Sequence, residues 1–256
     1  MDIRPIGIYD SGVGAAAVLR TAQRALPGER FILYADFDNA PYGDKSKKEI
    51  AHLAKEGVKL LVHKGVKAVV VACNTATSAA VDELREYFEI PIIGMEPAIK
   101  PAAESVEGGK ILVFATPATL RLMKFQKLSD SLGGKNIVPV ECPGLSILIE
   151  NTRPGAPEIG RYLADVLSGY ERHEISAAVI GCTHYSFIEN EIKKATGCGT
   201  IFDGRYGTVR HLKNTLIENG MLGAESPGTE YFLRGQEQRY RALIDDFMER
   251  PLSFEE

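Results

Sequence analysis

The sequence has no excess of positive charge and no long apolar run. Its 30 lysines and arginines are outnumbered by 34 aspartates and glutamates, which gives a formal net charge of -4. Binding to a phosphate backbone needs a basic excess, so we do not expect nucleic acid as a partner. No apolar run approaches the roughly 18 residues that span a bilayer, and the first residues lack the pattern of a secretory signal. We therefore expect no membrane partner and a cytoplasmic location.

Cysteines are also few, at positions 73, 142, 182 and 198. A chain of 256 residues that is 45% hydrophobic can build a core without disulfides, so we expect reduced thiols. None of the four lies in a Cys-x-x-Cys pair, and the one Cys-x-His segment, residues 182–184, lacks partners at zinc-ligand spacing. We expect no metal site.

Short β-branched segments alternate with segments of helical periodicity along nearly the whole chain. This alternation is typical of βαβ units and predicts an α/β fold with mainly parallel sheets. The predicted strands are residues 6–9, 31–34, 68–72, 90–93, 110–114, 136–141, 177–180 and 200–202. The predicted helices include residues 47–63, 78–88, 119–132, 157–168, 209–219 and 240–249.

Two segments repeat the same design. Residues 68–75 and 177–184 each read as a buried strand, a small residue, a cysteine and two polar residues that open a helix, and residues 6–11 resemble 111–116 at a similar offset. The repeat predicts two related α/β domains. We expect residues 1–97 plus 207–256 to form the first domain and residues 98–206 the second.

Cys73 and Cys182 end matched strands. Open α/β sheets bind ligands beyond the carboxyl ends of their strands, and a helix N-terminus lowers the pKa of a thiol placed there. Each thiol is therefore a candidate acid or base near neutral pH. Taken alone, either cysteine is better explained as a small buried hydrophobic residue, and the matched setting of the two favours the functional interpretation. Cys142 and Cys198 lack such a setting, and we interpret both as structural.

Three titratable residues are candidate partners of the thiols. Asp10 ends the first strand and is the candidate partner of Cys73. His184 follows Cys182 by two residues and is the candidate partner of that thiol. Glu150 is a second carboxylate candidate. The structural alternatives are an N-cap for Asp10, a capping group for His184 and a solvated helix charge for Glu150. Hydroxyl and amide side chains also lie at these strand ends, where they suit a ligand with carboxylates and an ammonium group.

With these segments in place, the sequence resembles the glutamate racemases of the aspartate/glutamate racemase superfamily. The resemblance rests on residues 6–14, 41–46, 71–76, 142–143 with Glu150 downstream, and 181–185, which occur in family order. It implies two pseudo-symmetric, doubly wound domains with the active site in the cleft between them and no cofactor or metal. It also implies an acidic amino acid as substrate, a possible homodimer and a supply of D-glutamate for peptidoglycan.

The resemblance also assigns roles to the matching residues. Cys73 is implied to remove the α-proton of the D-enantiomer and Cys182 that of the L-enantiomer, with Asp10, His184 and Glu150 in support. One base alone would tend to return the proton to the same face. The predicted substrate-binding residues are Asp10, Ser11, Pro41, Tyr42, Gly43, Asn74, Thr75, Thr116, Thr119, Thr183 and His184.

Other functions remain open at this point. The segment Gly12-x-Gly14-x-x-Ala17, with Asp36 ending the next strand, satisfies a dinucleotide-binding pattern and favours a nicotinamide-dependent oxidoreductase. Cys182 with His184 also fits a thiol hydrolase, and a non-catalytic binding protein for an acidic metabolite is a further alternative. Within the superfamily, aspartate is the alternative substrate, which differs from glutamate by one methylene.

Overall fold

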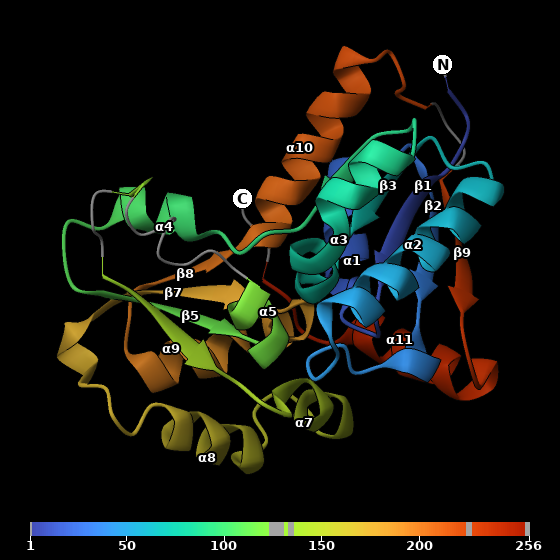
Figure 1. The fold of residues 1–256 in the computed structure, drawn as a ribbon. Helices are drawn as coiled ribbons and strands as arrows, with labels where there is room; N and C mark the ends of the chain where they lie inside the picture. Colours follow the sequence, from blue (N-terminus) through green and yellow to red (C-terminus); the bar gives the residue numbers. More distant parts are fainter. Residues whose placement is uncertain (1, 123–130, 133–135, 224–226, 254–256) are drawn as a thin grey trace.

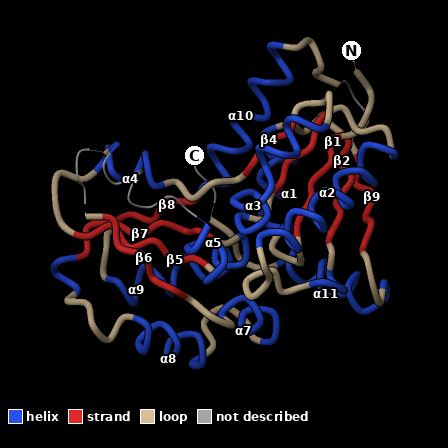
Figure 2. The backbone as a smooth tube through the Cα atoms, viewed as in Figure 1, coloured by secondary structure: helices blue, strands red, loops and turns tan. Residues whose placement is uncertain are grey.

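The strands form two sheets in which all pairs are parallel (Figures 1 and 2). The computed structural model describes residues 2–122, 131–132, 136–223 and 227–253. The first sheet has the order β4 (Ile92–Gly94), β3 (Ala68–Val71), β1 (Ile6–Asp10), β2 (Arg30–Ala35) and β9 (Gly228–Leu233). The second has the order β6 (Ile137–Glu141), β5 (Lys110–Ala115), β7 (Ile175–Gly181) and β8 (Thr200–Asp203).

Helices cover both faces of each sheet, as the parallel topology requires. The described α-helices are α1 (Ala15–Ala25), α2 (Lys47–His63), α3 (Asn74–Tyr87), α4 (Ile99–Ser105), α5 (Pro117–Leu122), α7 (Leu145–Asn151), α8 (Pro157–Val166), α9 (Glu189–Thr196), α10 (Gly204–Glu218) and α11 (Glu237–Glu249). Short 3₁₀ helices are η1 (Phe37–Asn39), η2 (Arg172–Glu174) and η3 (Thr183–Ile188). Among the described helices, none is long and apolar enough to cross a membrane.

The two sheets repeat one arrangement, so the predicted α/β fold with two related sheets is confirmed. In the first sheet β4, β3, β1 and β2 are neighbours in that order, and in the second β8, β7, β5 and β6 are neighbours in the same order. Each second-sheet strand thus occupies the place of the first-sheet strand four positions earlier in the chain. β9 has no counterpart, and the exact division into domains stays a prediction.

Successive side chains of a central strand point to opposite faces of the sheet, which explains why helices cover both faces. Ile6 and Ile8 of β1 pack on the face under α1, while Tyr9 packs on the opposite face under α2 and α3. The α1 core continues into Phe114 and Ile180 of the second sheet. One core therefore joins the two sheets and holds their carboxyl ends in a fixed relation.

Several predicted elements need correction. The strand β9 was not predicted, because it is an edge strand whose residues alternate between exposed and partly buried instead of forming an apolar run. β4 begins at Ile92, two residues later than predicted, and α3 begins at Asn74, four residues earlier. The predicted helix 119–132 is observed as α5 from Pro117 to Leu122, and residues 123–130 lie outside the described residues.

A buried ion pair next to β3 gives the first testable prediction. Lys67 Nζ donates to Glu29 Oε2 at 2.5 Å and to the Asp2 carbonyl at 2.8 Å, and both charged side chains are at most 4% exposed. Replacing Lys67 by methionine would leave the Glu29 charge buried without its partner. We expect Lys67→Met to lower the free energy of unfolding by about 3–5 kcal/mol.

Urea denaturation measures this loss, and an exposed ion pair supplies the control. Lys64 pairs with Glu230 at 2.9 Å, and both side chains are about half exposed. We expect Lys64→Met to cost about 0–1 kcal/mol. Equal losses in the two variants would contradict the importance of the buried pair.

Candidate active site

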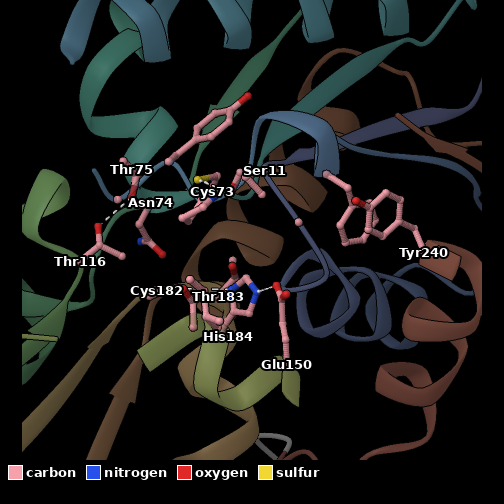
Figure 3. A pocket seen from close by; sticks show the side chains of 18 of the residues that line it. Ser11, Cys73, Asn74, Thr75, Thr116, Glu150, Cys182, Thr183, His184 and Tyr240 are labelled. Carbon is pink, nitrogen blue, oxygen red and sulfur yellow. Dashed lines mark hydrogen bonds and ion pairs between the residues drawn. The ribbon is translucent and has the colours of Figure 1, made fainter. Parts of the chain in front are cut away.

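A cavity of about 280 Å³ lies where the carboxyl ends of the two sheets meet. Ser11, Thr116 and Cys182 directly follow β1, β5 and β7, and Cys73 follows the end of β3 by two residues. Figure 3 shows the Cys73 side chain on one side of the pocket and Cys182 on the other. The fold thus brings the two repeated strand–cysteine segments to opposite walls of one cavity.

Most of the predicted site residues line this cavity. Those on its wall are Ser11, Pro41, Tyr42, Gly43, Cys73, Asn74, Thr75, Thr116, Glu150, Cys182, Thr183 and His184. Asp10 and Thr119 are fully buried and lie behind the wall, not on it. The wall also includes residues that were not predicted as site residues: Gly12, Phe37, Ala40, Ser146, Ile147, Asn151, Arg239 and Tyr240.

Cys73 lies at the N-terminus of α3 in a nearly closed setting. The Ala76 N–H donates to its Sγ at 3.5 Å, and the Ser11 hydroxyl lies 3.4 Å from the same sulfur. Burial, together with the negative charge of Asp10, raises the pKa of Cys73 to about 12. A position at a helix N-terminus predicts a lowered thiol pKa, and for Cys73 this prediction is wrong because desolvation outweighs the helix.

Asp10 does not cap the helix that follows it. Its Oδ1 accepts from the backbone N–H of Ser11 at 2.6 Å, whereas α1 starts from Gly14 without a side-chain cap. Burial raises the pKa of Asp10, and the positive charge of His184 opposes that shift. Its second oxygen, Oδ2, is buried without a hydrogen-bond partner. The carboxylate therefore has free acceptor capacity beside Cys73.

Cys182, His184 and Glu150 form a chain of contacts on the other wall. His184 Nδ1 lies 3.9 Å from Cys182 Sγ, and its Nε2 lies 2.8 Å from Glu150 Oε1. Cys182 directly precedes the 3₁₀ helix η3, which agrees with the helix predicted to begin after this cysteine. Glu150 projects from α7 and is only about a quarter exposed, so it is a partner of His184 and not a solvated helix charge.

The contacts of His184 keep it positively charged. Burial disfavours the imidazolium, but hydrogen bonding to Cys182 and Glu150 outweighs burial, so the pKa of His184 lies well above its usual value. A charged imidazole beside a sulfur can stabilise negative charge there and can transfer a proton to it. The two thiols therefore have different partners: a carboxylate near Cys73 and an imidazolium near Cys182.

Polar groups on the wall are arranged for a small zwitterion. Asn74 Nδ2 donates to the Met95 carbonyl at 3.1 Å, which fixes the amide orientation and leaves its buried Oδ1 without a partner. That oxygen can accept from an ammonium group. Thr75 and Thr116 hydroxyls lie 3.0 Å apart, and both contact Thr119, so Thr119 orients two wall hydroxyls from behind.

The loop of residues 40–43 closes one side of the cavity. Tyr42 is buried, and its hydroxyl donates to Asp36 Oδ2 at 2.7 Å and lies 2.6 Å from that of Tyr9. Gly43 accepts from the Ala118 N–H at 3.1 Å, which links this loop to α5. Asp36, the ribose-binding candidate of the oxidoreductase alternative, is fully buried, and its carboxylate is already engaged by Tyr42.

Among the described residues, no group of three or more His, Cys, Asp or Glu side chains is arranged to hold a metal ion. The described part of the wall supplies thiols, hydroxyls, the amides of Asn74 and Asn151, the Arg239 guanidinium and one carboxylate–imidazole pair. The expectation of a reaction without cofactor or metal stays a prediction.

Comparisons with known proteins show the family of this chain. Residues 15–206 match the family model described as Asp/Glu/Hydantoin racemase. A glutamate racemase from Clostridium botulinum is 48% identical over 225 residues, which cover 87% of this chain and 88% of that protein.

Solved structures give the same result over the whole length. A glutamate racemase isoform from Bacillus anthracis has a TM-score of 0.87 at 29% identity and covers 100% of this chain and 97% of its own. A glutamate racemase from Francisella tularensis in complex with D-glutamate has a TM-score of 0.86 at 26% identity, covering 99% and 96%. The chain belongs to the Asp/Glu/hydantoin racemase family, as a glutamate racemase.

Proposed function

We propose that this glutamate racemase interconverts L- and D-glutamate by a two-thiol mechanism, in which Cys73 and Cys182 act on opposite faces of the substrate Cα. The observation that carries the proposal is the presence of two thiols on opposite walls of one small cavity, each with its own titratable partner. Among the described residues of the wall, the two cysteines are the matched pair of acid–base groups that follow the two repeated strands. Racemisation needs one on each side, because a proton returned to the same face restores the original enantiomer.

The proton transfers balance in either direction. For D-glutamate, the Cys73 thiolate takes the α-proton, and the Cys182 thiol gives its proton to the opposite face of Cα. L-Glutamate reacts in the reverse sense, starting from the Cys182 thiolate. After each turnover the protonation states of the two sulfurs are exchanged, and the adjacent Asp10 and His184 restore them through solvent.

The substrate itself helps to activate the buried thiol. Its ammonium group enters a cavity where desolvation disfavours the Cys73 thiolate, and added positive charge favours that thiolate. The Asn74 Oδ1 is placed to accept from this ammonium group. Backbone and hydroxyl donors around Thr75, Thr116 and Thr183 stabilise the negative charge that develops on the α-carboxylate.

The test incubates the purified protein with each enantiomer of glutamate and aspartate in deuterated buffer. We expect optical rotation to decay with glutamate, with deuterium at Cα of the inverted product. If glutamate shows neither decay of optical rotation nor deuterium at Cα, the proposal is contradicted. A higher kcat/KM for aspartate than for glutamate would show that aspartate is the preferred substrate.

The role of Asp10 gives a prediction for the pH profile. Because the pKa of Cys73 is raised, we expect kcat/KM for D-glutamate to rise with pH through and above neutrality as the thiolate forms. The Asp10 carboxylate contributes to that raised pKa, so Asp10→Asn lowers it and moves the rise to lower pH. The pH at which the rise levels off reports the pKa of Cys73. The maximal kcat/KM is read separately, because it also falls when Asp10 no longer supports the thiol.

Kinetics between about pH 6 and 12, a range that reaches the pKa of about 12 for Cys73, measure the shift, using Glu158→Gln in α8 as a control that removes an exposed carboxylate. The control should have the profile of the unchanged protein. A profile that Asp10→Asn does not move would contradict electrostatic coupling between Asp10 and Cys73.

Three further expectations accompany this proposal. Glutamate racemase activity implies a role in peptidoglycan synthesis, where D-glutamate is used. A cytoplasmic location and a homodimer stay predictions. Sedimentation velocity at micromolar protein concentration tests the dimer, and a single species with the mass of one chain would contradict it.

A further inference from the structure

The cavity wall includes a side chain from the far end of the chain. Arg239 and Tyr240 belong to α11, whereas most of the remaining wall residues lie between residues 11 and 184. The Tyr240 ring stacks on Phe37 of η1 with centroids 4.1 Å apart and an angle of 4° between planes. Figure 3 shows Tyr240 at the edge of the pocket, away from both thiols. This stacking fixes the start of α11 at the rim.

The charge of the wall makes Arg239 distinctive. Among the described residues that line the cavity, Arg239 is the one arginine or lysine, and it is exposed to solvent. Glu150 on the wall contacts the His184 imidazole at 2.8 Å, so its charge is offset there, and the buried Asp10 lies behind the wall. Glutamate has two carboxylates and one ammonium group and therefore a net negative charge. Without Arg239, the described residues of the wall would offer no arginine or lysine to a negatively charged substrate that approaches from solution.

We propose that Arg239 captures the acidic substrate: its guanidinium at the rim attracts glutamate from solution and directs it between the two thiols. The inference rests on the proposed function, because it assigns a residue for the entry of the same substrate. A charge at the rim acts mainly on the rate of encounter and makes that rate depend on salt. It does not take part in the proton transfers, so it affects kcat/KM more than kcat.

The experiment compares four forms of the full-length protein: unchanged, Arg239→Gln, Arg239→Lys and Arg241→Gln. Arg241 lies on the same helix, pairs with Asp245 at 2.9 Å and does not line the cavity, so Arg241→Gln makes the same change of net charge elsewhere. Racemisation of L-glutamate is measured at about 20 mM and about 500 mM salt, where the screening lengths differ severalfold. Thermal unfolding of each variant verifies that the fold is retained.

We expect Arg239→Gln to lower kcat/KM by about threefold to tenfold at low salt with little change in kcat. High salt should reduce that difference, and Arg239→Lys should retain most of the activity because it keeps the charge. Arg241→Gln should behave as the unchanged protein. If Arg239→Gln matches Arg241→Gln at low salt, or lowers kcat and kcat/KM equally at both salts, the inference is overturned. An unchanged protein that is inactive on glutamate would instead overturn the proposed function.

Discussion

Replacing either Cys73 or Cys182 by alanine is expected to abolish net racemisation of glutamate. Each thiol is the only acid–base group proposed for its face of the substrate, so loss of one leaves inversion without a proton donor or without a base. General acid–base groups contribute about 10²–10⁴-fold to a rate, and a two-thiol mechanism uses both groups in every turnover. We therefore expect kcat/KM to fall by about 10³-fold or more in each variant, in both directions.

Exchange without inversion distinguishes the two thiols. In Cys182→Ala, Cys73 can still remove the α-proton of D-glutamate and return a solvent-derived deuteron to the same face. In Cys73→Ala, the same reasoning applies to L-glutamate. We expect each variant to incorporate deuterium slowly into one enantiomer, with retention of configuration, as followed by proton NMR and chiral chromatography.

Cys198→Ser is the matched control for these substitutions. Cys198 is buried away from the cavity, and its Sγ contacts the Thr200 carbonyl at 3.4 Å, a contact that a serine hydroxyl can also make. We expect racemisation by this variant to be unchanged. Exchange of the opposite enantiomer in each alanine variant would reverse the assigned faces. Full racemisation by either alanine variant would refute the two-thiol mechanism.

The central part of this fold is readable from the sequence because buried parallel strands have a simple signature. β3 consists of Ala68–Val71, all buried, and its apolar run is followed at once by the polar start of α3. β7 ends in the same way at Cys182. Since carboxyl ends of parallel strands meet at one edge, these local patterns were sufficient to place both thiols at the site.

The return of the chain to the first sheet could be predicted from the sequence only in part. We predicted that the final helix returns to the first domain, but nothing in residues 228–233 shows that they pair with β2, since an edge strand with an exposed face has no continuous apolar run. The contribution of Arg239 to the cavity depends on that pairing and on the stacking of Tyr240 with Phe37. Long-range contacts of this kind have no local sequence signal.

The pKa of the Cys73 thiol also could not be predicted from the sequence. A cysteine at the start of a helix predicts a lowered pKa, whereas the actual value for Cys73 depends on how completely α3, β1 and the opposite wall exclude water from the sulfur. Desolvation is a property of the assembled cavity. The same assembly supplies the Glu150 carboxylate that keeps His184 charged, although 34 positions separate the two in the chain.

Gly14→Ala is expected to give the second-largest loss of activity. Gly14 precedes α1, and a Cβ added there would overlap the Thr183 side chain and lie 2.8 Å from His184 Nδ1, the atom that faces Cys182. The helix cannot retreat, because Ala15, Ala16 and Ala17 are fully buried in the core behind it. Thr183 and His184 must move instead.

A shift of about 1 Å in a catalytic group costs about 10²-fold, so we expect kcat to fall by about that factor in Gly14→Ala. Overpacking should also lower the free energy of unfolding by about 1–3 kcal/mol. Gly160→Ala in α8 is the matched control, since an added Cβ there meets nothing within 4 Å. That variant should keep full activity and gain about 0.5–1 kcal/mol, because alanine favours a helix over glycine. Racemisation kinetics with urea denaturation separate the two effects, and a fully active Gly14→Ala would show that Thr183 and His184 need not be held where α1 places them.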